Sequence, residues 1–264
     1  MDYQSLCHKV IEVVKEAGAY IQSESKEFNR NKDVGYKGRN DLVTYVDKAS
    51  EEKLISSLQA LLPESGVMAE EDHQDFQHDK NLNWIIDPLD GTLNFVHQIP
   101  CYCVSVALTE GEEVKLGVVY ELNQDECFYA YKGGGAYLND DPIRVSNTTA
   151  MEDALFATGF PFMEPEIVKF YTGILNHLLA NTRGVRRIGS AAVDLCYTAM
   201  GRFDGYYEFN LKAWDVAAGA LIVTEAGGDV FDFRGGENYL FDGEIIAGNP
   251  AISNAFYQLF KKHS

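Results

Sequence analysis

The sequence predicts a mixed α/β (α+β) protein made of two closely packed halves. A helical pattern opens the chain, because Leu6, Val10 and Val14 recur at three- and four-residue intervals. Strand patterns follow between residues 83 and 131, separated by Gly or acidic residues at the expected turns. After residue 150, strand and helix patterns alternate to the end of the chain. This order favours two α/β halves that meet near residues 147–153.

The individual elements follow from the same patterns. Helices are expected at 6–21, about 47–61, 167–179, 190 to about 200, 213–226 and from Pro250 onward. Strands are expected at 66–69, 83–87, 102–109, 113–120, 126–131, 154–158, 184–188, 205–208, and near 230 and 245. Asp47 suits the N-cap of the second helix, and Pro63 marks its end.

Two segments without helical or strand periodicity are expected to be connections. Residues 28–41 predict a mobile loop or a loose hairpin. Gly133-Gly134-Gly135 lacks the following Lys-Ser/Thr and the helix of a phosphate-binding loop, so we interpret it as a hairpin turn.

The composition excludes several classes of function. The 264 residues are 46% hydrophobic and carry 40 acidic against 22 basic side chains, a formal net charge of −18. This acid excess, without a Lys/Arg-rich stripe, argues against nucleic-acid binding and membrane-surface attachment. No apolar run approaches a membrane span, and no secretory signal is apparent. We therefore expect a soluble, cytoplasmic protein whose single domain covers 1–264, with halves of about 1–148 and 149–264.

The cysteines do not indicate a disulfide framework, because five of them are scattered along a long chain: Cys7, Cys101, Cys103, Cys127 and Cys196. Cys101 and Cys103 alternate within a predicted strand and are expected on the same face of it. We interpret them as small buried side chains rather than zinc ligands.

Carboxylates at the end of one predicted strand indicate a metal site. Asp87 follows a continuous apolar run, and Pro88 is expected to end the strand. Asp90 then begins a turn toward a helix N-terminus. Two carboxylates three residues apart converge on one point, which is unfavourable unless a cation lies between them. The backbone N–H groups of Gly91 and Thr92 suit an anion, so the segment predicts a metal-assisted phosphate site.

Two further acidic segments could join this site. Glu70-Glu71-Asp72 follows a short apolar strand, and it is either an exposed acidic loop or the source of a third carboxylate. Asp215 stands beside Trp214 ahead of an apolar helix, and it is either the N-cap of that helix or a ligand. A donor set of oxygen atoms alone favours Mg²⁺ over Zn²⁺.

Two potential catalytic side chains have simpler interpretations. His97 is a candidate general base, but a metal-activated water needs no histidine, so we favour packing or a loop contact. Ser190 lacks the surrounding sequence of a nucleophile elbow. We interpret it as a helix N-cap whose neighbouring N–H groups face the site.

These segments resemble the signatures of the inositol monophosphatase family of lithium-sensitive, magnesium-dependent phosphatases. The first signature stands at 84–95 as W-I-I-D-P-L-D-G-T-L-N-F, and the second at 214–219 as W-D-V-A-A-G. Order and spacing also agree at 41–47, 70–71, 117–120, 189–192 and 224–228. The resemblance extends from about residue 5 to the C-terminus. One departure is A-E-E-D at 69–72, where G-E-E-S is common.

The resemblance implies a layered αβαβα sandwich, usually a homodimer, that hydrolyses a phosphate monoester with two or three Mg²⁺ ions and is inhibited by lithium. It implies attack by a metal-activated water without a covalent intermediate, with inositol 1-phosphate as the leading substrate. Fructose 1,6-bisphosphate, histidinol phosphate, NADP and a 3′-phosphoadenosine nucleotide are alternatives. A catalytically silent cation-binding module is the alternative from another class.

The resemblance also implies roles for individual residues. The metal ligands would be Glu70, Asp87, the backbone carbonyl of Leu89, Asp90 and Asp215. Catalytic roles would fall to Glu70, Thr92 and Asp47, with Asp47 orienting the Thr92 hydroxyl. Substrate contacts would come from Asp90, Gly91, Thr92, Ser190, Ala191, Glu208 and Asp215. Lys37 would lie on a loop that closes over the site.

Overall fold

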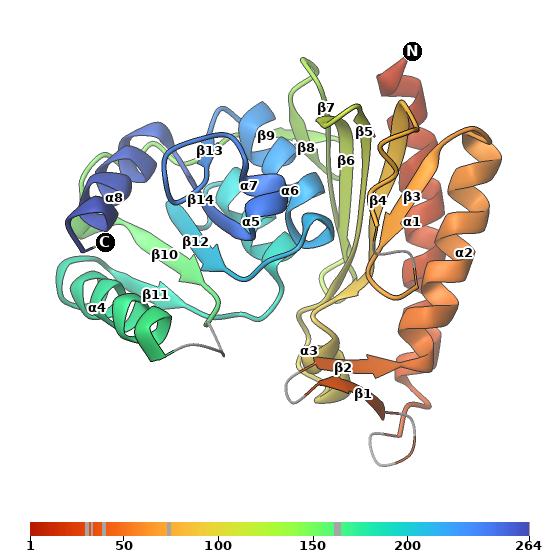
Figure 1. The fold of residues 1–264 in the computed structure, drawn as a ribbon, viewed down its shortest axis with the longest axis horizontal. Helices are drawn as coiled ribbons and strands as arrows, with labels where there is room; N and C mark the ends of the chain where they lie inside the picture. Colours follow the sequence, from red (N-terminus) through yellow and green to blue (C-terminus); the bar gives the residue numbers. More distant parts are fainter. Residues whose placement is uncertain (30–31, 33, 39–40, 73–74, 161–164, 264) are drawn as a thin grey trace.

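Five layers of helices and sheets build the protein. The computed structural model describes residues 1–29, 32, 34–38, 41–72, 75–160 and 165–263. Two sheets alternate with three pairs of helices, so the order of layers is αβαβα (Figure 1). The prediction of a layered α/β sandwich is therefore confirmed.

The larger sheet has seven strands in the order β3-β4-β5-β6-β7-β8-β9. Only its first pair, β3 and β4, is parallel. The strands are β3 (Gly66–Ala69), β4 (Leu82–Asp90), β5 (Cys103–Glu110), β6 (Glu113–Glu121), β7 (Glu126–Tyr131), β8 (Ala136–Leu138) and β9 (Asp141–Ile143). The three consecutive glycines lie in the turn between β7 and β8, as predicted.

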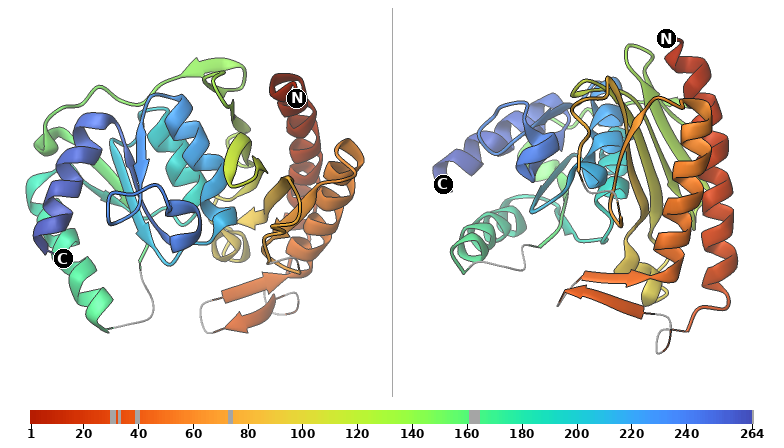
Figure 2. Two further views of the ribbon diagram at one scale, coloured as in Figure 1. Left: turned by 45° about the horizontal axis from the view of Figure 1, so that its top comes forward. Right: turned by 45° about the vertical axis from the view of Figure 1, so that its right-hand side comes forward.

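Helices α1 (Tyr3–Ser25) and α2 (Tyr45–Leu61) cover the outer face of this sheet, side by side in Figures 1 and 2. Asp2 caps α1 by accepting the N–H of Ser5 at 3.1 Å. The apolar stripe of α1 packs with Trp84 and Ile86 of β4. Ile85, between them in the sequence, packs with the helices on the opposite face. Because successive side chains of a strand point to opposite faces of the sheet, β4 is buried between two layers of helices.

Helices α5 (Ala191–Ala199) and α6 (Ala213–Glu225) fill the central layer between the two sheets. The approach of α6 to β6 is very close at Gly117, where a Cβ atom would lie 2.8 Å from the Cα of Ala218. Glycine is therefore required here by the packing of the neighbouring backbone rather than by its own conformation.

The smaller sheet has five strands in the order β11-β10-β12-β14-β13. They are β10 (Leu155–Thr158), β11 (Gly184–Arg186), β12 (Gly205–Phe209), β13 (Asp229–Phe231) and β14 (Glu244–Gly248). Helices α4 (Pro165–Asn181) and α8 (Pro250–His263) cover its outer face (Figure 1). The short elements are α3 (Thr92–Val96), a 3₁₀-helix at Met151–Asp153 and α7 (Tyr239–Asp242).

A hairpin occupies part of the segment predicted as a loop or loose hairpin. β1 (Val34–Gly38) pairs antiparallel with β2 (Asp41–Thr44). The second of the two alternatives is therefore the one that the structure contains.

One local prediction, the end of a strand at Pro88, is wrong. β4 runs through Pro88 to Asp90, and its pairing with β5 shifts register between Asp87 and Asp90. A proline is tolerated in a strand at such an irregularity, because the ladder bond that its missing N–H would make is already absent there. Cys101 precedes β5 and is only half-buried, whereas Cys103 lies within the strand and is fully buried. Both side chains nevertheless pack against the same core cluster, which includes α5 and α6.

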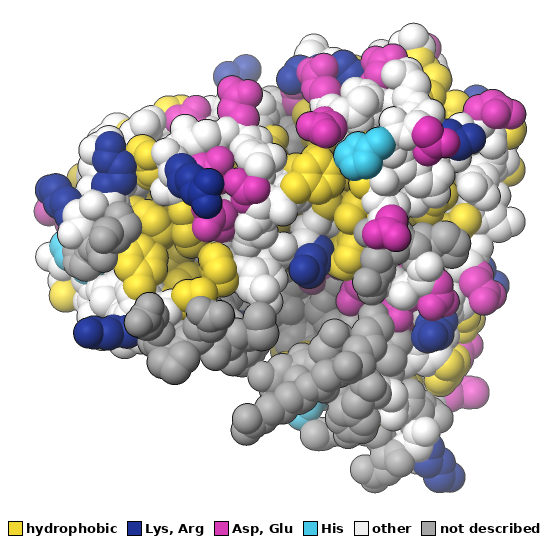
Figure 3. All heavy atoms as spheres, viewed as in Figure 1, with side chains coloured by type: hydrophobic (Ala, Val, Ile, Leu, Met, Phe, Trp, Pro, Cys, Tyr) yellow, Lys and Arg dark blue, Asp and Glu magenta, His cyan; other side chains and the backbone are white. Residues whose placement is uncertain are grey.

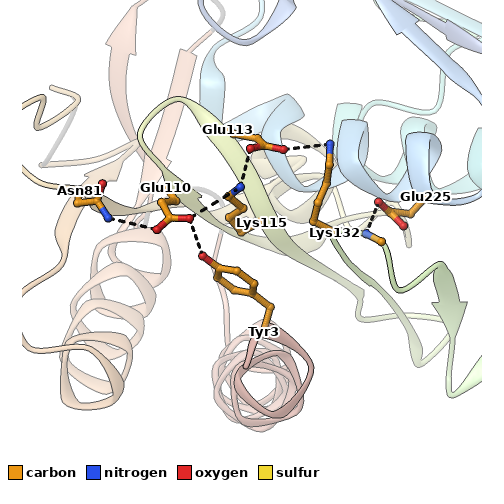
Figure 4. A network of polar contacts seen from close by, with 8 residues as sticks. Tyr3, Asn81, Glu110, Glu113, Lys115, Lys132 and Glu225 are labelled. Atoms are coloured by element: carbon orange, nitrogen blue, oxygen red, sulfur yellow. Dashed lines mark hydrogen bonds and ion pairs between the residues drawn. The ribbon is translucent and has the colours of Figure 1, made fainter. Parts of the chain in front are cut away.

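A network of hydrogen bonds and ion pairs connects the turns of the larger sheet with α1 and lies beside the C-terminal end of α6 (Figure 4). Glu110 accepts a hydrogen bond from the Tyr3 hydroxyl at 3.1 Å, and Lys115 links it to Glu113. Lys132 continues the network from Glu113 at 3.1 Å. Glu225 accepts the N–H of Gly133 nearby. These contacts tie α1, two hairpin turns and the end of α6 together.

Charged side chains are dispersed on the face shown in Figure 3, where Asp and Glu lie interspersed with Lys and Arg over several elements. No helix in the described ranges combines the length and apolar character needed to cross a bilayer.

Candidate active site

Three carboxylates from two layers meet at one point. Asp87 and Asp90 come from the C-terminal end of β4, and Asp215 comes from the first turn of α6. One oxygen from each lies within 4.8 Å of the others. The packing of α6 against β4 places the first turn of the helix beside the irregular end of the strand. The two acidic segments that the sequence suggested separately are thus adjacent in space.

The environment of this cluster opposes ionisation. Burial, followed by the charges of Glu70, Asp90 and Asp215, raises the pKa of Asp87 well above its ordinary value. Burial and the Asp90 charge raise the pKa of Asp215 to about 8. A divalent cation would reverse both effects, because it supplies the opposite charge that the protein does not. The donor set fits a hard cation such as Mg²⁺.

Asp87 and Asp215 are each held by a backbone N–H group of their own chain segment. Asp87 Oδ1 accepts the N–H of Leu89 at 3.0 Å. Asp215 Oδ2 accepts the N–H of Lys212 at 2.6 Å. Asp215 stands at the third helical position, and Lys212 is the N-cap, so the interpretation of Asp215 as the N-cap is wrong.

The third carboxylate, Asp90, joins β4 to α5. Its Oδ2 accepts the Ser190 hydroxyl at 2.6 Å and the N–H of Ala192 at 2.8 Å. Ser190 is the N-cap of α5, as the sequence predicted, and its own oxygen accepts the N–H of Val193. The N-terminus of α5 therefore faces the acidic cluster.

A further carboxylate outside the group of three, Asp47, accepts a hydrogen bond from the Thr92 hydroxyl. Thr92 Oγ1 lies 3.0 Å from Asp47 Oδ1 and 3.0 Å from the carbonyl oxygen of Leu89. Asp47 Oδ2 accepts the N–H of Thr44 at 2.8 Å, and Thr44 is the N-cap of α2. Asp47 is thus the N3 residue of a capping box, and the prediction of Asp47 as the N-cap is wrong. Gly91 caps α3 with a φ of +93°, which favours glycine.

Glu70 stands at the edge of the cluster. It lies outside the group of three, although its charge helps to raise the pKa of Asp87. Its loop is anchored by Glu51 of α2, which accepts the N–H groups of Glu71 at 2.8 Å and Asp72 at 3.0 Å. Sequence reasoning missed Glu51. Its spacing of four residues from Asp47, on one helix face, was the available signal.

A small cavity of about 130 Å³ adjoins Asp90 and Asp215. Glu208 lines it and accepts the Tyr206 hydroxyl at 2.7 Å, and burial raises the pKa of Glu208 to about 7. A Cβ atom at Gly159 would lie 1.8 Å from a Glu208 oxygen, so glycine leaves the space that Glu208 occupies. The remaining lining residues are Thr158, Arg187, Gly189, Ser190, Ala191, Asp194 and Leu211.

Asp194 is a further lining residue that sequence reasoning missed. Both of its carboxylate oxygens are buried without a hydrogen-bond partner, and burial raises its pKa well above the ordinary value. It lies inside the apolar pattern of α5, between Val193 and Leu195, where its neighbours gave no sign of a polar environment.

Two other candidates from the sequence are Lys37 and His97. The side chain of Lys37 lies outside what the structure describes, although its backbone belongs to β1. His97 ends α3 and is exposed.

The fold and the site together define a layered α/β protein with a buried carboxylate centre suited to a divalent cation. The profile of the inositol monophosphatase family matches residues 2–264. The chain therefore belongs to the inositol monophosphatase family, whose activity is the hydrolysis of phosphate monoesters.

Relatives and solved structures cover nearly the whole chain. "Nus factor SuhB" of Pasteurella multocida is 42% identical over 244 residues, covering 92% of this chain and 90% of that protein. The extragenic suppressor protein suhB from Bartonella henselae superposes with a TM-score of 0.92 at 37% identity, over 98% of this chain and 99% of that one. An inositol monophosphatase from Anabaena gives a TM-score of 0.85 at 33% identity, over 99% and 97%.

Proposed function

We propose that this phosphatase converts inositol 1-phosphate to inositol and phosphate with Mg²⁺ bound at the acidic cluster. The observation that carries the proposal is the meeting of Asp87, Asp90 and Asp215 within 4.8 Å beside a cavity of about 130 Å³. Binding sites of drug-sized ligands are commonly about 300–1,000 Å³, so the cavity favours a compact leaving group.

The carboxylates divide between metal positions in this proposal. Glu70, Asp87 and the Leu89 carbonyl would hold one ion, and Asp87, Asp90 and Asp215 would hold a second. A third ion would bind more weakly near Glu70. When bound, the ions activate a water as nucleophile and stabilise negative charge on the phosphoryl oxygens. The reaction then proceeds without a covalent intermediate.

The neighbouring groups orient the reactants. The hydrogen bond to Asp47 fixes the Thr92 hydroxyl for contact with the nucleophilic water. Gly91, Thr92, Ser190 and Ala191 contact phosphate through backbone N–H or hydroxyl groups, since helix N-termini favour anions. Glu208 accepts hydrogen bonds from the hydroxyl groups of inositol, and Lys37 closes over the site.

The distribution of polar groups supports a polyol over a nucleotide. Asp194 and Glu208 line the cavity with acceptors, and hydroxyl groups are donors that match them. Arg187 is the basic side chain among the lining residues. An adenosine group would need more space than this cavity offers.

A phosphate-release panel tests the substrate assignment. It compares inositol 1-phosphate, fructose 1,6-bisphosphate, histidinol phosphate, NADP and a 3′-phosphoadenosine nucleotide, each with Mg²⁺. We expect the highest kcat/KM for inositol 1-phosphate and inhibition by millimolar lithium. Asp90→Asn should nearly abolish turnover, whereas Asp79→Asn on the exposed surface should not change it. Turnover of only a nucleotide or histidinol phosphate would make the substrate assignment wrong.

The relatives' name favours a second role, as a Nus factor. We propose that a surface outside the acidic cluster carries this role, so the two activities are separable. Binding to Nus factors is compared for the wild type and Asp90→Asn. Equal binding with lost turnover supports two separate roles.

We further propose a homodimer in the cytoplasm, and light scattering on the purified protein measures the oligomeric state.

A further inference from the structure

We propose that Glu51 is a positioning residue of the metal site, which sets the geometry of Glu70 by clamping the loop that follows it. The inference rests on the proposed function, because it takes Glu70 to be a metal ligand. Glu51 is only 2% exposed, and its two oxygens accept the N–H groups of two consecutive residues. Such a paired acceptor fixes the direction of the loop as well as its distance from α2.

Glu70 is held from both sides by this arrangement. Its own N–H donates to the carbonyl of Ile86 on β4 at 3.3 Å. The next two N–H groups, of Glu71 and Asp72, donate to Glu51. The backbone around Glu70 is thus fixed between the strand that carries Asp87 and the helix that carries Asp47.

Helix α2 therefore reaches the site at two points. Asp47 holds the Thr92 hydroxyl, and Glu51, one helical turn later, holds the loop after Glu70. Both side chains are buried and lie on the same face of α2. The helix packs on β4 and begins in a capping box, so it is a rigid reference for both contacts. One helix thus positions both the Thr92 hydroxyl and the loop that follows Glu70.

The chemistry requires a carboxylate at position 51. A glutamine has one side-chain oxygen, so Glu51→Gln can accept from only one of the two backbone N–H groups. Its NH₂ group would face the other N–H, and two donors cannot pair. Replacing a residue that orients a metal ligand commonly weakens metal binding about 10–100-fold.

The test measures Mg²⁺ binding without substrate. Wild type, Glu51→Gln and the control Glu52→Gln, an exposed neighbour on α2, are titrated with Mg²⁺ in a calorimeter at room temperature. Hydrogen exchange of the Glu71 and Asp72 amides is measured on the same proteins. We expect Glu51→Gln to bind Mg²⁺ at least about tenfold more weakly, with faster exchange of these amides. Its kcat should return to within about threefold of wild type at saturating Mg²⁺, and Glu52→Gln should match wild type throughout.

Each outcome decides the inference. Wild-type affinity for Mg²⁺ in a folded Glu51→Gln protein overturns it and leaves the proposed function intact. A wild-type protein that binds no Mg²⁺ overturns both. If Glu51→Gln does not fold, Glu51→Asp replaces it, because aspartate keeps the charge but withdraws the oxygens by one methylene group. Failure of both variants to fold overturns the inference, since Glu51 then serves the fold as a whole.

Discussion

Replacing Asp215 by asparagine should stabilise the metal-free protein while it destroys activity. Asp87, Asp90 and Asp215 offer oxygens within 4.8 Å of one another. Two unit charges at that distance repel by about 3 kcal/mol at an effective dielectric constant of about 20. Asparagine keeps an oxygen for the Lys212 N–H, which Asp215 accepts at 2.6 Å, so the helix start is preserved.

The pKa of Asp215 determines how the stability difference between Asp215→Asn and the wild type depends on pH. The pKa of Asp215 is raised to about 8, so the folded state binds its proton more tightly than the unfolded chain does. Stability of the metal-free protein therefore falls as pH rises from about 4, the ordinary carboxyl value, through about 8. Asparagine removes this loss. The advantage of the variant should be about 3 kcal/mol near pH 9 and largely disappear near pH 4, where the carboxyl is protonated in the folded state and about half protonated in the unfolded chain.

Urea unfolding followed by circular dichroism, in the presence of a chelator, measures this difference at both pH values. Phosphate release with saturating Mg²⁺ should fall by at least about 100-fold in the same variant, because a ligand of the proposed second ion is lost. A variant that is less stable than wild type near pH 9 without metal would refute the electrostatic reasoning. A fully active variant would refute the metal assignment.

Three other substitutions separate chemistry from packing. Thr92→Val removes the hydroxyl that donates to Asp47. We expect kcat/KM to fall at least about 100-fold and stability to fall by about 1 kcal/mol. The control Thr92→Ser keeps the hydroxyl and should retain most activity. Because the pKa of Glu208 is about 7, the wild-type KM for inositol 1-phosphate, measured at saturating Mg²⁺, should rise as pH falls below that value. Glu208→Gln should abolish this dependence at saturating Mg²⁺; a persisting rise would assign it to another group. Gly117→Ala should lower stability by about 1–3 kcal/mol through its contact with Ala218, with unchanged kcat in the folded fraction, as thermal melts and kinetics will show.

Much of the fold followed from local pattern. The stripe of α1 and the apolar run of β4 need burial on particular faces, and the layers satisfy that need. The ends of elements were less predictable. Pro88 was expected to end β4, but a shift in register accommodates it, and such a shift depends on the partner strand β5. No local signal in the sequence reports a partner's register.

The carboxylates of the site were identified more readily than the groups that support them. Asp87 and Asp90 could be identified from the sequence, because charged residues directly after an apolar strand indicate a functional site. Glu51 and Asp194 could not, since a helix surface ordinarily carries acids and only tertiary packing buries these two. Asp47 and Asp215 were each compatible with an N-cap. The structure places both at the third helical position, where one oxygen caps the helix and the carboxylate also faces the site.

The chain carries a net charge of −18, and the acidic cluster is also negatively charged when its carboxyl groups are ionised. These negative charges repel an anionic substrate. Raised pKa values of Asp87 and Asp215 mean that protons partly neutralise the metal-free cluster near neutral pH. Protons alone leave no positive charge to attract a phosphate ester. Two or three divalent ions would replace those protons and add about +4 to +6 to the site. We therefore expect substrate affinity to depend on the bound metal. Because metal binding competes with protons, the affinities for metal and for substrate should strengthen together as pH rises toward about 8.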